Sequence, residues 1–212
     1  MSEEPGGVSE RFRILTVCTG NICRSPFAEA LLREGLQRFN VVEVASSGTG
    51  AMVGQPMTPE MIAIAREYGV SAPEQHRARD LVVGELRNVD LALALTRAHR
   101  SEIVSMLPRG SRHTFTLREL ARLFEAVQQS DLTKIAELPL TETVPRLTGL
   151  IEIAAALRGY VPPPEDVDDD DVIDPFRRGN EIYQLATAQL VPAVVTILNR
   201  FEMAATITPD QV

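Results

Sequence analysis

One short stretch constrains the fold of this chain more than any other. Residues 12–17 are mostly apolar and β-branched, which predicts a buried strand, and residues 27–36 have the composition of a helix. Between them, Ser25 is predicted to cap the helix and Pro26 to be its first residue. The chain therefore passes from the end of a strand, through the loop of residues 18–24, into the N-terminus of a helix.

This loop predicts an anion site that contains a nucleophile. Unpaired backbone N–H groups and the positive end of a helix dipole gather where such a loop enters a helix, and they bind phosphate-like anions. Cys18 lies at that point, where the same field favours a thiolate over a thiol. Arg24 adds a planar cation that can bind two oxygens of a tetrahedral anion.

The composition indicates one intracellular globular domain. With 212 residues, 44% of them hydrophobic, the chain is long enough to bury a proper core. A net charge of −8 argues against nucleic-acid binding, which needs a basic surface. The chain has two cysteines, Cys18 and Cys23, which are too few for a disulfide framework and fit a reducing compartment.

No membrane segment is expected either. Residues 1–7 are acidic and polar, and they lack the basic and apolar regions of a secretory signal. The apolar run at residues 190–198 is interrupted by Pro192 and is too short to span a bilayer. We therefore expect a cytoplasmic protein that binds neither nucleic acid nor membrane.

The order of the predicted elements indicates an α/β fold with a four-stranded parallel sheet flanked by helices. Strands are expected at residues 12–17, 41–47, 90–96 and 112–116. Helices are expected at residues 27–36, 59–68, 97–106, 117–128, 144–157 and 179–201, the second of them capped by Thr58.

Residues 129–172 break the alternation of strands and helices. We expect them to be an insertion in a single domain of residues 11–203, with a solvated loop around the acidic run Asp166–Asp171. Residues 1–10 and 204–212 are expected to be flexible tails.

The string Cys18-Thr19-Gly20-Asn21-Ile22-Cys23-Arg24-Ser25-Pro26 resembles the phosphate loop of the low-molecular-weight protein-tyrosine phosphatases. Other segments resemble this family too: Ser46-Ser47-Gly48-Thr49, the basic turn His76-Arg77-Ala78-Arg79, the strand Asp90–Thr96 followed by Arg97, and Asp174-Pro175-Phe176 before the last helix. The likeness covers most of residues 12–125 and 173–201. It implies the three-layer, Rossmann-like phosphotyrosine phosphatase I fold.

The resemblance and the chemistry of the loop together predict a phosphatase that works by two in-line displacements. Cys18 attacks phosphorus to form a phosphocysteine, while Asp174 protonates the leaving oxygen and then activates water as a carboxylate. The expected phosphate-binding residues are Thr19, Gly20, Asn21, Ile22, Cys23, Arg24 and Ser25, acting mainly through backbone N–H groups. No metal or organic cofactor is required, and the three histidines, His76, His99 and His113, show no ligand spacing.

The resemblance also implies a supporting brace, in which Asn21 is hydrogen-bonded with Ser25, Ser47 and His76. The Ser25 hydroxyl would then stabilise the Cys18 thiolate as a leaving group. Cys23 is either a packing residue or a partner for a reversible disulfide with Cys18 under oxidation.

The substrate is expected to be a phosphorylated protein or a small aryl phosphate, with inorganic phosphate as product. Met52 and Phe176 are the expected walls for a phenyl ring, since the chain has no Trp. Relatives that act on phosphoarginine carry Thr where this chain has Ile22, which favours phosphotyrosine. The strand before Arg97 often ends in Asp in the family, whereas here it ends in Thr96.

Three alternatives accompany this prediction. Asp174 competes for the acid role with the aspartates of the preceding acidic run, and an Asp-Pro pair is also typical of a plain turn. An arsenate reductase shares the fold and loop, but it relays a disulfide through further cysteines that this chain lacks. The third alternative is a non-catalytic anion-binding or scaffold protein.

Overall fold

The computed structural model describes residues 11–212, so the tail expected at residues 1–10 lies outside the described residues. Four strands form one parallel sheet in the order β2-β1-β3-β4. They are β1 (Phe12–Cys18), β2 (Val42–Gly48), β3 (Leu91–Ala94) and β4 (Thr114–Thr116). The predicted four-stranded parallel sheet is confirmed, although β4 is shorter than expected because Pro108–His113 form a 3₁₀ helix.

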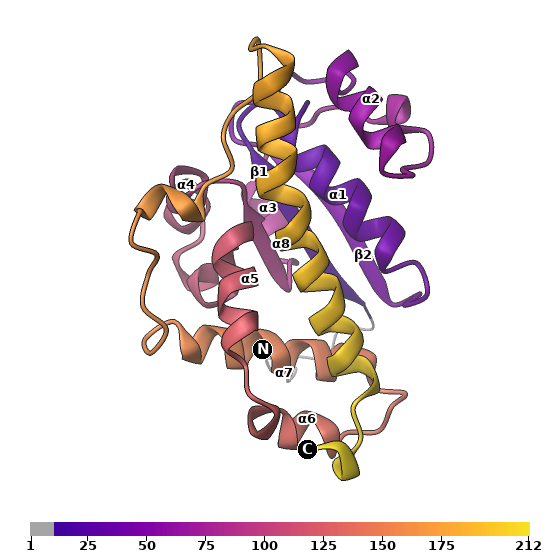
Figure 1. Cartoon of the computed structure of the whole chain (residues 1–212), viewed down its shortest axis with the longest axis vertical. Helices are drawn as coiled ribbons and strands as arrows, with labels where there is room; N and C mark the ends of the chain where they lie inside the picture. Colours follow the sequence, from indigo (N-terminus) through magenta and orange to yellow (C-terminus); the bar gives the residue numbers. More distant parts are fainter. Residues whose placement is uncertain (1–10) are drawn as a thin grey trace, which may run out of the picture.

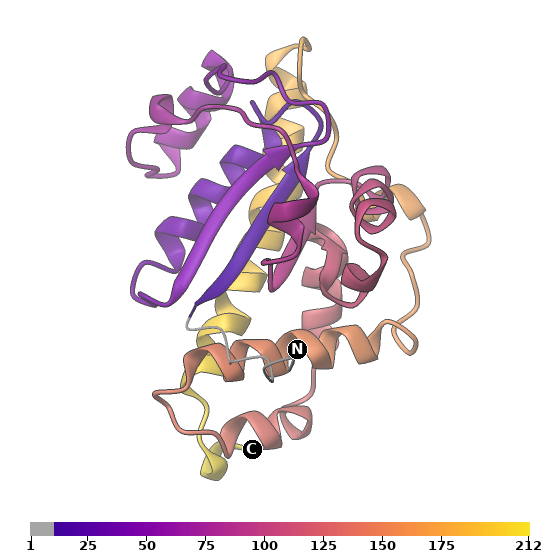
Figure 2. The same ribbon diagram turned by 180° about the vertical axis from the view of Figure 1, so that it is seen from behind.

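Helices cover both faces of this sheet and make three layers (Figures 1 and 2). The helices α1 (Arg24–Gly35), α5 (Leu117–Ala126) and α8 (Asn180–Thr206) pack on one face, and α3 (Val83–Leu86) and α4 (Arg97–Met106) pack on the other. The remaining helices are α2 (Pro59–Glu67), α6 (Thr133–Ala136) and α7 (Thr143–Leu157), and short 3₁₀ helices lie at Pro73–Gln75, Gln129–Leu132, Val167–Asp170 and Pro209–Gln211.

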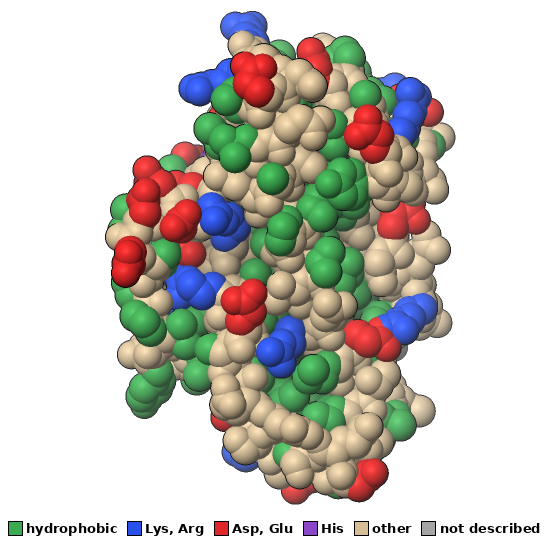
Figure 3. Space-filling model, in the orientation of Figure 1, with side chains coloured by type: hydrophobic (Ala, Val, Ile, Leu, Met, Phe, Trp, Pro, Cys, Tyr) green, Lys and Arg blue, Asp and Glu red, His purple; other side chains and the backbone are tan. Residues whose placement is uncertain are grey.

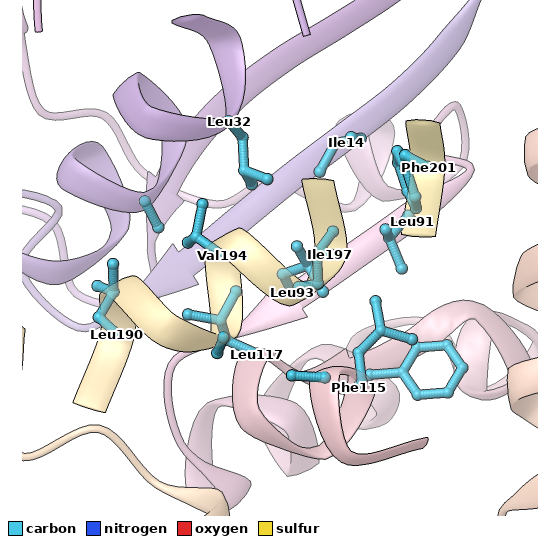
Figure 4. Close-up of a cluster of buried hydrophobic side chains, with 14 of the residues drawn as sticks. Ile14, Leu32, Leu91, Leu93, Phe115, Leu117, Leu190, Val194, Ile197 and Phe201 are labelled. Carbon is cyan, nitrogen blue, oxygen red and sulfur yellow. The ribbon is translucent and has the colours of Figure 1, made fainter. Parts of the chain in front are cut away.

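Strand alternation divides the core between the two faces. Ile14 points towards α8, where it joins Leu91 and Phe115 in the larger cluster (Figure 4). Leu15 and Val17 point to the opposite face and pack in a smaller cluster under α3 and α4. The central strands are therefore buried on both faces, and they place Cys18 at the edge of the sheet where all four strands end.

The start of α1 differs from the prediction. The helix begins at Arg24, Cys23 occupies the capping position, and Ser25 and Pro26 lie inside the first turn. Ser25 does not cap the helix because its hydroxyl contacts the Cys18 sulfur instead. Pro26 is tolerated there because the N–H groups of the first helical turn have no partner within the helix.

The predicted insertion is mostly helical and lies away from the end of β1. Helices α6 and α7 cross the end of the molecule opposite to the start of α8, and the chain then returns past α5 and α4 (Figures 1 and 2). Any contribution of the insertion to the candidate site therefore comes from its last segment, residues 166–172.

The acidic run in that segment is largely exposed, as predicted, but it is not a free loop, because Val167–Asp170 form a 3₁₀ helix. Asp168–Asp171 are paired with three arginines of α4 and α5, at the edge of the molecule where acidic and basic side chains gather in Figure 3. The pairs are Arg97 with Asp168 and Asp171, Arg118 with Asp169, and Arg122 with Asp170. These ion pairs come from residues about 50 to 70 positions apart, which a scan of local composition does not detect.

By length and composition alone, α8 could cross a membrane, since it has 27 residues and a mean hydropathy of 1.3. It is longer than the predicted apolar run at residues 190–198 and continues through Pro192. In the structure its apolar residues Leu190, Val194 and Phe201 are buried against the sheet, as Figure 4 shows. This packing is typical of the core helix of an α/β domain.

The C-terminal end of α8 is held by a buried arginine, which differs from the expected tail at residues 204–212. Arg146 of α7 is fully buried, and its Nε donates a hydrogen bond of 2.8 Å to the carbonyl of Ala204. Its two terminal nitrogens donate to the carbonyls of Leu138 and Ile207. The guanidinium thus satisfies carbonyl groups at a helix C-terminus that have no partner within the helix.

Replacing Arg146 with alanine is expected to lower the free energy of unfolding by roughly 3 kcal/mol, because three buried carbonyls lose their donor at about 1 kcal/mol each or more. Denaturant unfolding of the variant measures this change. Arg200→Ala is the matched control, since Arg200 is a half-buried residue of α8 whose guanidinium contacts the Met203 sulfur and no buried carbonyl in the described part of the chain. Equal stability of the two variants would contradict the anchoring role.

Candidate active site

The loop after β1 turns its carbonyl groups outward. The five carbonyls of residues 18–22 accept hydrogen bonds of 2.7–3.1 Å from outside the loop, namely from the N–H groups of Thr49, Gly50, Met52 and Thr58 and, at Asn21, from the His76 ring. Asn21 has a φ of 53°, a left-handed conformation that Asn tolerates. Within residues 11–212, no acceptor is bonded to the N–H groups of residues 19–23. The loop can therefore offer these donors to an anion.

The close contact between this loop and β2 explains why a glycine is required at position 48. A Cβ atom added at Gly48 would lie 2.3 Å from the carbonyl oxygen of Thr19, so no larger residue fits without moving the loop. Gly48 pairs with Cys18 in the sheet register. The glycine of the Ser46-Ser47-Gly48-Thr49 segment thus allows β2 to approach the loop at Cys18 and Thr19 closely.

Most of the predicted site residues line one small cavity of about 160 Å³ at the end of β1. Its lining comprises Cys18, Thr19, Gly20, Ile22, Cys23 and Arg24 from the loop, Gly50 and Met52 from the next loop, and Asp174 and Phe176 from the segment before α8. Three segments far apart in the sequence therefore meet at one point. The size of the cavity suits a phosphoryl group with part of its leaving group.

Arg24 is almost completely buried beside this cavity, with 4% of its surface exposed. One terminal nitrogen donates to the carbonyl of Val172 at 2.9 Å, and the other lies 3.1 Å from a carboxylate oxygen of Asp174. The Nε–H is buried and has no partner among the described residues. A guanidinium fixed in this way keeps a donor available for an oxyanion.

The Cys18 sulfur is buried and lies 3.0 Å from the Ser25 hydroxyl oxygen. The Asn21 amide donates to that same oxygen at 2.9 Å and to the Ser46 hydroxyl at 2.8 Å, while its own oxygen accepts from the Arg79 N–H. Because the Ser25 oxygen already accepts from Asn21, its own proton is free to point at the sulfur.

The structure places Ser46, and not the predicted Ser47, in the brace around Asn21. Ser46 also donates to the buried carboxylate of Glu29 at 2.5 Å. The hydroxyl of Ser47 is buried without a partner among the described residues, and only its carbonyl is 3.4 Å from the Ser25 hydroxyl. Successive side chains of a strand point to opposite faces, so an error of one position exchanges the two serines.

Ser46→Ala is expected to lower kcat/KM about tenfold, because it removes one acceptor from the amide that orients Ser25. Ser47→Ala is the matched control one position along the strand, and it should change kcat/KM by less than about twofold. Steady-state kinetics on p-nitrophenyl phosphate measure both variants. Should Ser47→Ala be the more damaging change, the brace described here would be wrong.

Asp174 is carried by a segment that is fixed on all sides. Its neighbours Val172 and Ile173 donate backbone hydrogen bonds to the carbonyl of Leu95 and to the side chain of Gln189. The Asp171 carboxylate accepts from the backbone N–H of Arg97 at the start of α4, at 2.7 Å. Among the aspartates of residues 166–174, only Asp174 lines the cavity, and the others that compete for its role face arginines or solvent.

The cavity walls are less aromatic than those of a typical aryl-binding site. Met52 is 39% exposed at the rim, and Phe176 is half-buried with the Arg177 guanidinium 5.1 Å from its ring centre. Ile22 is buried and lines the cavity. The lining is apolar where a substrate side chain would enter and polar around Arg24.

Cys23 also lines the cavity, and its sulfur contacts the hydroxyl groups of Thr58 and Tyr183 at 3.6 and 3.8 Å. Burial raises the pKa of the Cys23 thiol to about 11, so this sulfur is protonated at neutral pH. Both cysteines are free thiols in the structure. The two cysteines of the loop thus differ in environment, because the Cys18 sulfur contacts the Ser25 hydroxyl and the Cys23 sulfur contacts Thr58 and Tyr183.

One residue at the site was missed by the sequence analysis. His99 of α4 is buried, and its Nε2 lies 2.8 Å from the Thr19 hydroxyl. Thr96, whose departure from the family pattern had no explanation, caps α4 by accepting from the His99 N–H at 3.2 Å. The spacing Thr96-x-x-His99 at a helix start was the one available signal, but it says nothing about contact with Thr19.

No group of three or more His, Cys, Asp or Glu side chains in the described part of the chain is arranged to hold a metal ion. The donors available to a ligand at this site are backbone N–H groups and one guanidinium. This donor set suits an anion such as phosphate.

The sequence of residues 13–133, more than half of the chain, matches the family model of the low molecular weight phosphotyrosine protein phosphatases. The chain belongs to this family, whose members are enzymes. It is 39% identical over 107 residues to the probable low molecular weight protein-tyrosine-phosphatase EpsP of Ralstonia nicotianae, covering 50% of this chain and 71% of that one. It is also 37% identical over 108 residues to a protein-arginine-phosphatase of Geobacillus stearothermophilus, and the match covers 51% of this chain and 70% of that one.

Solved structures extend the similarity over the C-terminal half of the fold. The YwlE arginine phosphatase from Geobacillus stearothermophilus superposes with a TM-score of 0.62 at 25% identity, covering 91% of this chain and 94% of that one. Vibrio vulnificus Wzb in complex with benzylphosphonate superposes with a TM-score of 0.59 at 22% identity, covering 89% of this chain and 98% of that one. At this identity the similarity shows the fold alone. The predicted family and three-layer fold are confirmed.

Proposed function

We propose that this enzyme hydrolyses phosphotyrosine in proteins, or small aryl phosphates, through a phosphocysteine on Cys18. The observation that carries the proposal is the loop itself, whose five carbonyls point outward and whose N–H groups have no acceptor among the described residues. The buried Cys18 lines the same cavity as Arg24, whose Nε–H has no partner in the described part of the chain. Donors fixed in advance around the equatorial oxygens stabilise the charge of a phosphoryl-transfer transition state without reorganisation. A merely anion-binding protein has no use for a sulfur at the centre of such a cradle.

In the first step the Cys18 thiolate attacks phosphorus and the bond to the leaving oxygen breaks. Asp174 transfers its proton to that oxygen, so the product alcohol or phenol leaves neutral. The Arg24 guanidinium and the N–H groups of residues 19–24 bind the three remaining oxygens. Arg24 and Asp174 line the same cavity as Cys18, which supports this arrangement.

In the second step water attacks phosphorus and the sulfur departs as thiolate. Asp174, now a carboxylate, accepts a proton from this water, which restores the acid for the next turnover. The Ser25 hydroxyl, 3.0 Å from Cys18, donates to the departing sulfur and lowers the barrier to its release. Inorganic phosphate is the second product.

The relatives include both protein-tyrosine and protein-arginine phosphatases, so the choice between these substrates depends on this chain's own cavity. Ile22 places an apolar side chain in the lining, and Met52 and Phe176 provide two apolar walls. A flat phenyl ring buries apolar surface against these groups, whereas a guanidinium would leave its N–H donors unpaired. We therefore favour phosphotyrosine.

A panel of peptides that differ only in phosphotyrosine, phosphoarginine or phosphoserine tests the substrate choice. The phosphotyrosine peptide should have a kcat/KM above that of the others by about tenfold or more. A preference for phosphoarginine would overturn the substrate class while leaving the chemistry of Cys18 in place. Absence of turnover on every phosphopeptide and on p-nitrophenyl phosphate, with arsenate reduced in the presence of a thiol, would instead favour the reductase alternative.

We also propose a cytoplasmic location. Both cysteines are free thiols, and the reaction requires Cys18 in its reduced form, which a reducing compartment maintains.

A further inference from the structure

We propose that His99 is a positioning residue for the phosphate loop: its neutral ring donates from Nε2 to the Thr19 hydroxyl and so directs the hydroxyl proton towards a bound phosphoryl group. The inference rests on the proposed function, since it assigns a further donor to the same anion site. His99 belongs to α4, on the face of the sheet opposite α1, and reaches the loop from behind.

The protons around His99 can be assigned from its contacts. The Thr96 hydroxyl oxygen accepts from the His99 backbone N–H at 3.2 Å and lies 2.9 Å from the ring Nδ1. A hydroxyl has one proton, and donating it to Nδ1 satisfies both atoms. Nδ1 is then the acceptor nitrogen and the ring proton resides on Nε2, which lies 2.8 Å from the Thr19 hydroxyl oxygen. The opposite tautomer would leave the Thr96 proton without an acceptor among the described residues.

The surroundings of His99 keep its ring neutral. The side chain is buried, and burial together with the nearby positive charge of Arg24 lowers the pKa of His99 to about 4. Acidic groups at Glu102, Asp171 and Asp174 act in the opposite direction but do not compensate. The tautomer with a single proton on Nε2 therefore persists through the neutral pH range.

The proton on Nε2 determines how the hydroxyl of Thr19, the residue directly after Cys18, is oriented. Its hydroxyl oxygen accepts from His99, so its own proton is left for another acceptor, and Thr19 is part of the cavity lining. The side chain is exposed, so without His99 it would sample several rotamers. With His99 it adds a side-chain donor to the backbone donors of residues 19–23.

Calorimetric titration with inorganic phosphate tests the proposal without relying on turnover. Thr19→Val and His99→Leu should each weaken phosphate binding about tenfold, the usual worth of one hydrogen bond to a charged group. The double variant should be no weaker than either single one, because both remove the same interaction. His99→Gln keeps an N–H donor at a similar reach and should recover most of the affinity, while His113→Leu, a half-buried histidine outside the site, serves as the matched control.

Several results would overturn the positioning role. Full phosphate affinity in Thr19→Val would do so even if His99→Leu failed to fold, because Thr19 is exposed and tolerates the change. Losses that multiply in the double variant, or no recovery in His99→Gln, would show that His99 acts only on the fold. If wild-type protein bound no phosphate at all, the proposed function would fail rather than this inference alone.

A spectroscopic readout tests the same assignment independently. In nitrogen-15 spectra of the imidazole side chains, His99 should show a protonated Nε2 and an unprotonated Nδ1 at pH 7, and it should remain neutral at about pH 5 because its pKa is depressed. A ring protonated on Nδ1 alone, or one that becomes cationic with the ordinary pKa of a histidine, would contradict the proposal.

Discussion

Replacing Cys18 with serine is expected to reduce turnover of p-nitrophenyl phosphate by at least about 10⁴-fold, because the proposed nucleophile is removed from a preorganised site. The serine hydroxyl is nearly the same size, so the sheet register at Gly48 and the outward carbonyls of the loop are retained. Phosphate binding should therefore survive in this variant. Steady-state kinetics and calorimetry on the same preparation separate the two effects.

Cys23→Ser is the matched control for Cys18→Ser, because Cys23 is the other cysteine of the same loop. Burial raises the pKa of its thiol to about 11, and its sulfur contacts Thr58 and Tyr183, whereas the Cys18 sulfur contacts the Ser25 hydroxyl. This variant should lose far less activity than Cys18→Ser. If Cys18→Ser retained wild-type turnover, or if the two variants were equally inactive, the assignment of the nucleophile would be refuted.

Asp174→Asn should reduce kcat on phenyl phosphates by roughly 10²–10⁴-fold, the usual contribution of general acid catalysis. The loss should grow as the leaving group becomes a poorer one, because a good leaving group such as p-nitrophenolate needs less help from a proton. Asp174 is half-exposed, so the substitution should leave stability almost unchanged. A series of substituted phenyl phosphates measures this dependence.

Asp169→Asn is the matched control, since Asp169 is an exposed aspartate of the same segment that lies outside the cavity. Its kcat should stay within about twofold of wild type for every leaving group. A neutral Asp174→Asn combined with an impaired Asp168, Asp170 or Asp171 variant would move the acid role to another carboxylate.

The parts of this molecule that local patterns encode were predictable. The strand before Cys18, the helix after it and the parallel order of the sheet follow from periodicity and from turn residues that lie close together in the chain. The string from Cys18 to Pro26 was also enough to predict the family. These features need no knowledge of distant contacts.

The predictions that failed depend on contacts between distant residues or on a shift of one position. Ser46 and Ser47 are adjacent in β2, and only the direction of the strand face decides which of them meets Asn21. His99 reaches Thr19 across 80 positions, and Arg146 reaches Ala204 across 58. Such long-range pairs leave no periodic trace in the sequence, so they become visible only when the chain is folded.

The ion pairs of the acidic run also join residues far apart in the sequence. Composition predicts an exposed loop at Asp166–Asp171, because runs of like charge are usually exposed, and Asp166, Asp168 and Asp169 are exposed. Composition does not reveal that the fold brings Arg97, Arg118 and Arg122 to these carboxylates and thereby fixes the segment that carries Asp174. The ion pairs matter here for position, since exposed pairs contribute little to stability.

The central claim is that phosphoryl transfer passes through Cys18, and direct detection of the intermediate tests it best. Wild-type protein mixed with excess p-nitrophenyl phosphate is quenched with acid within one turnover, digested and analysed by mass spectrometry. The peptide that contains Cys18 should carry the mass of one phosphoryl group, and the corresponding peptide of Cys18→Ser should not. Continued turnover with an unmodified Cys18 peptide, or a phosphoryl group on any other residue, would contradict the account.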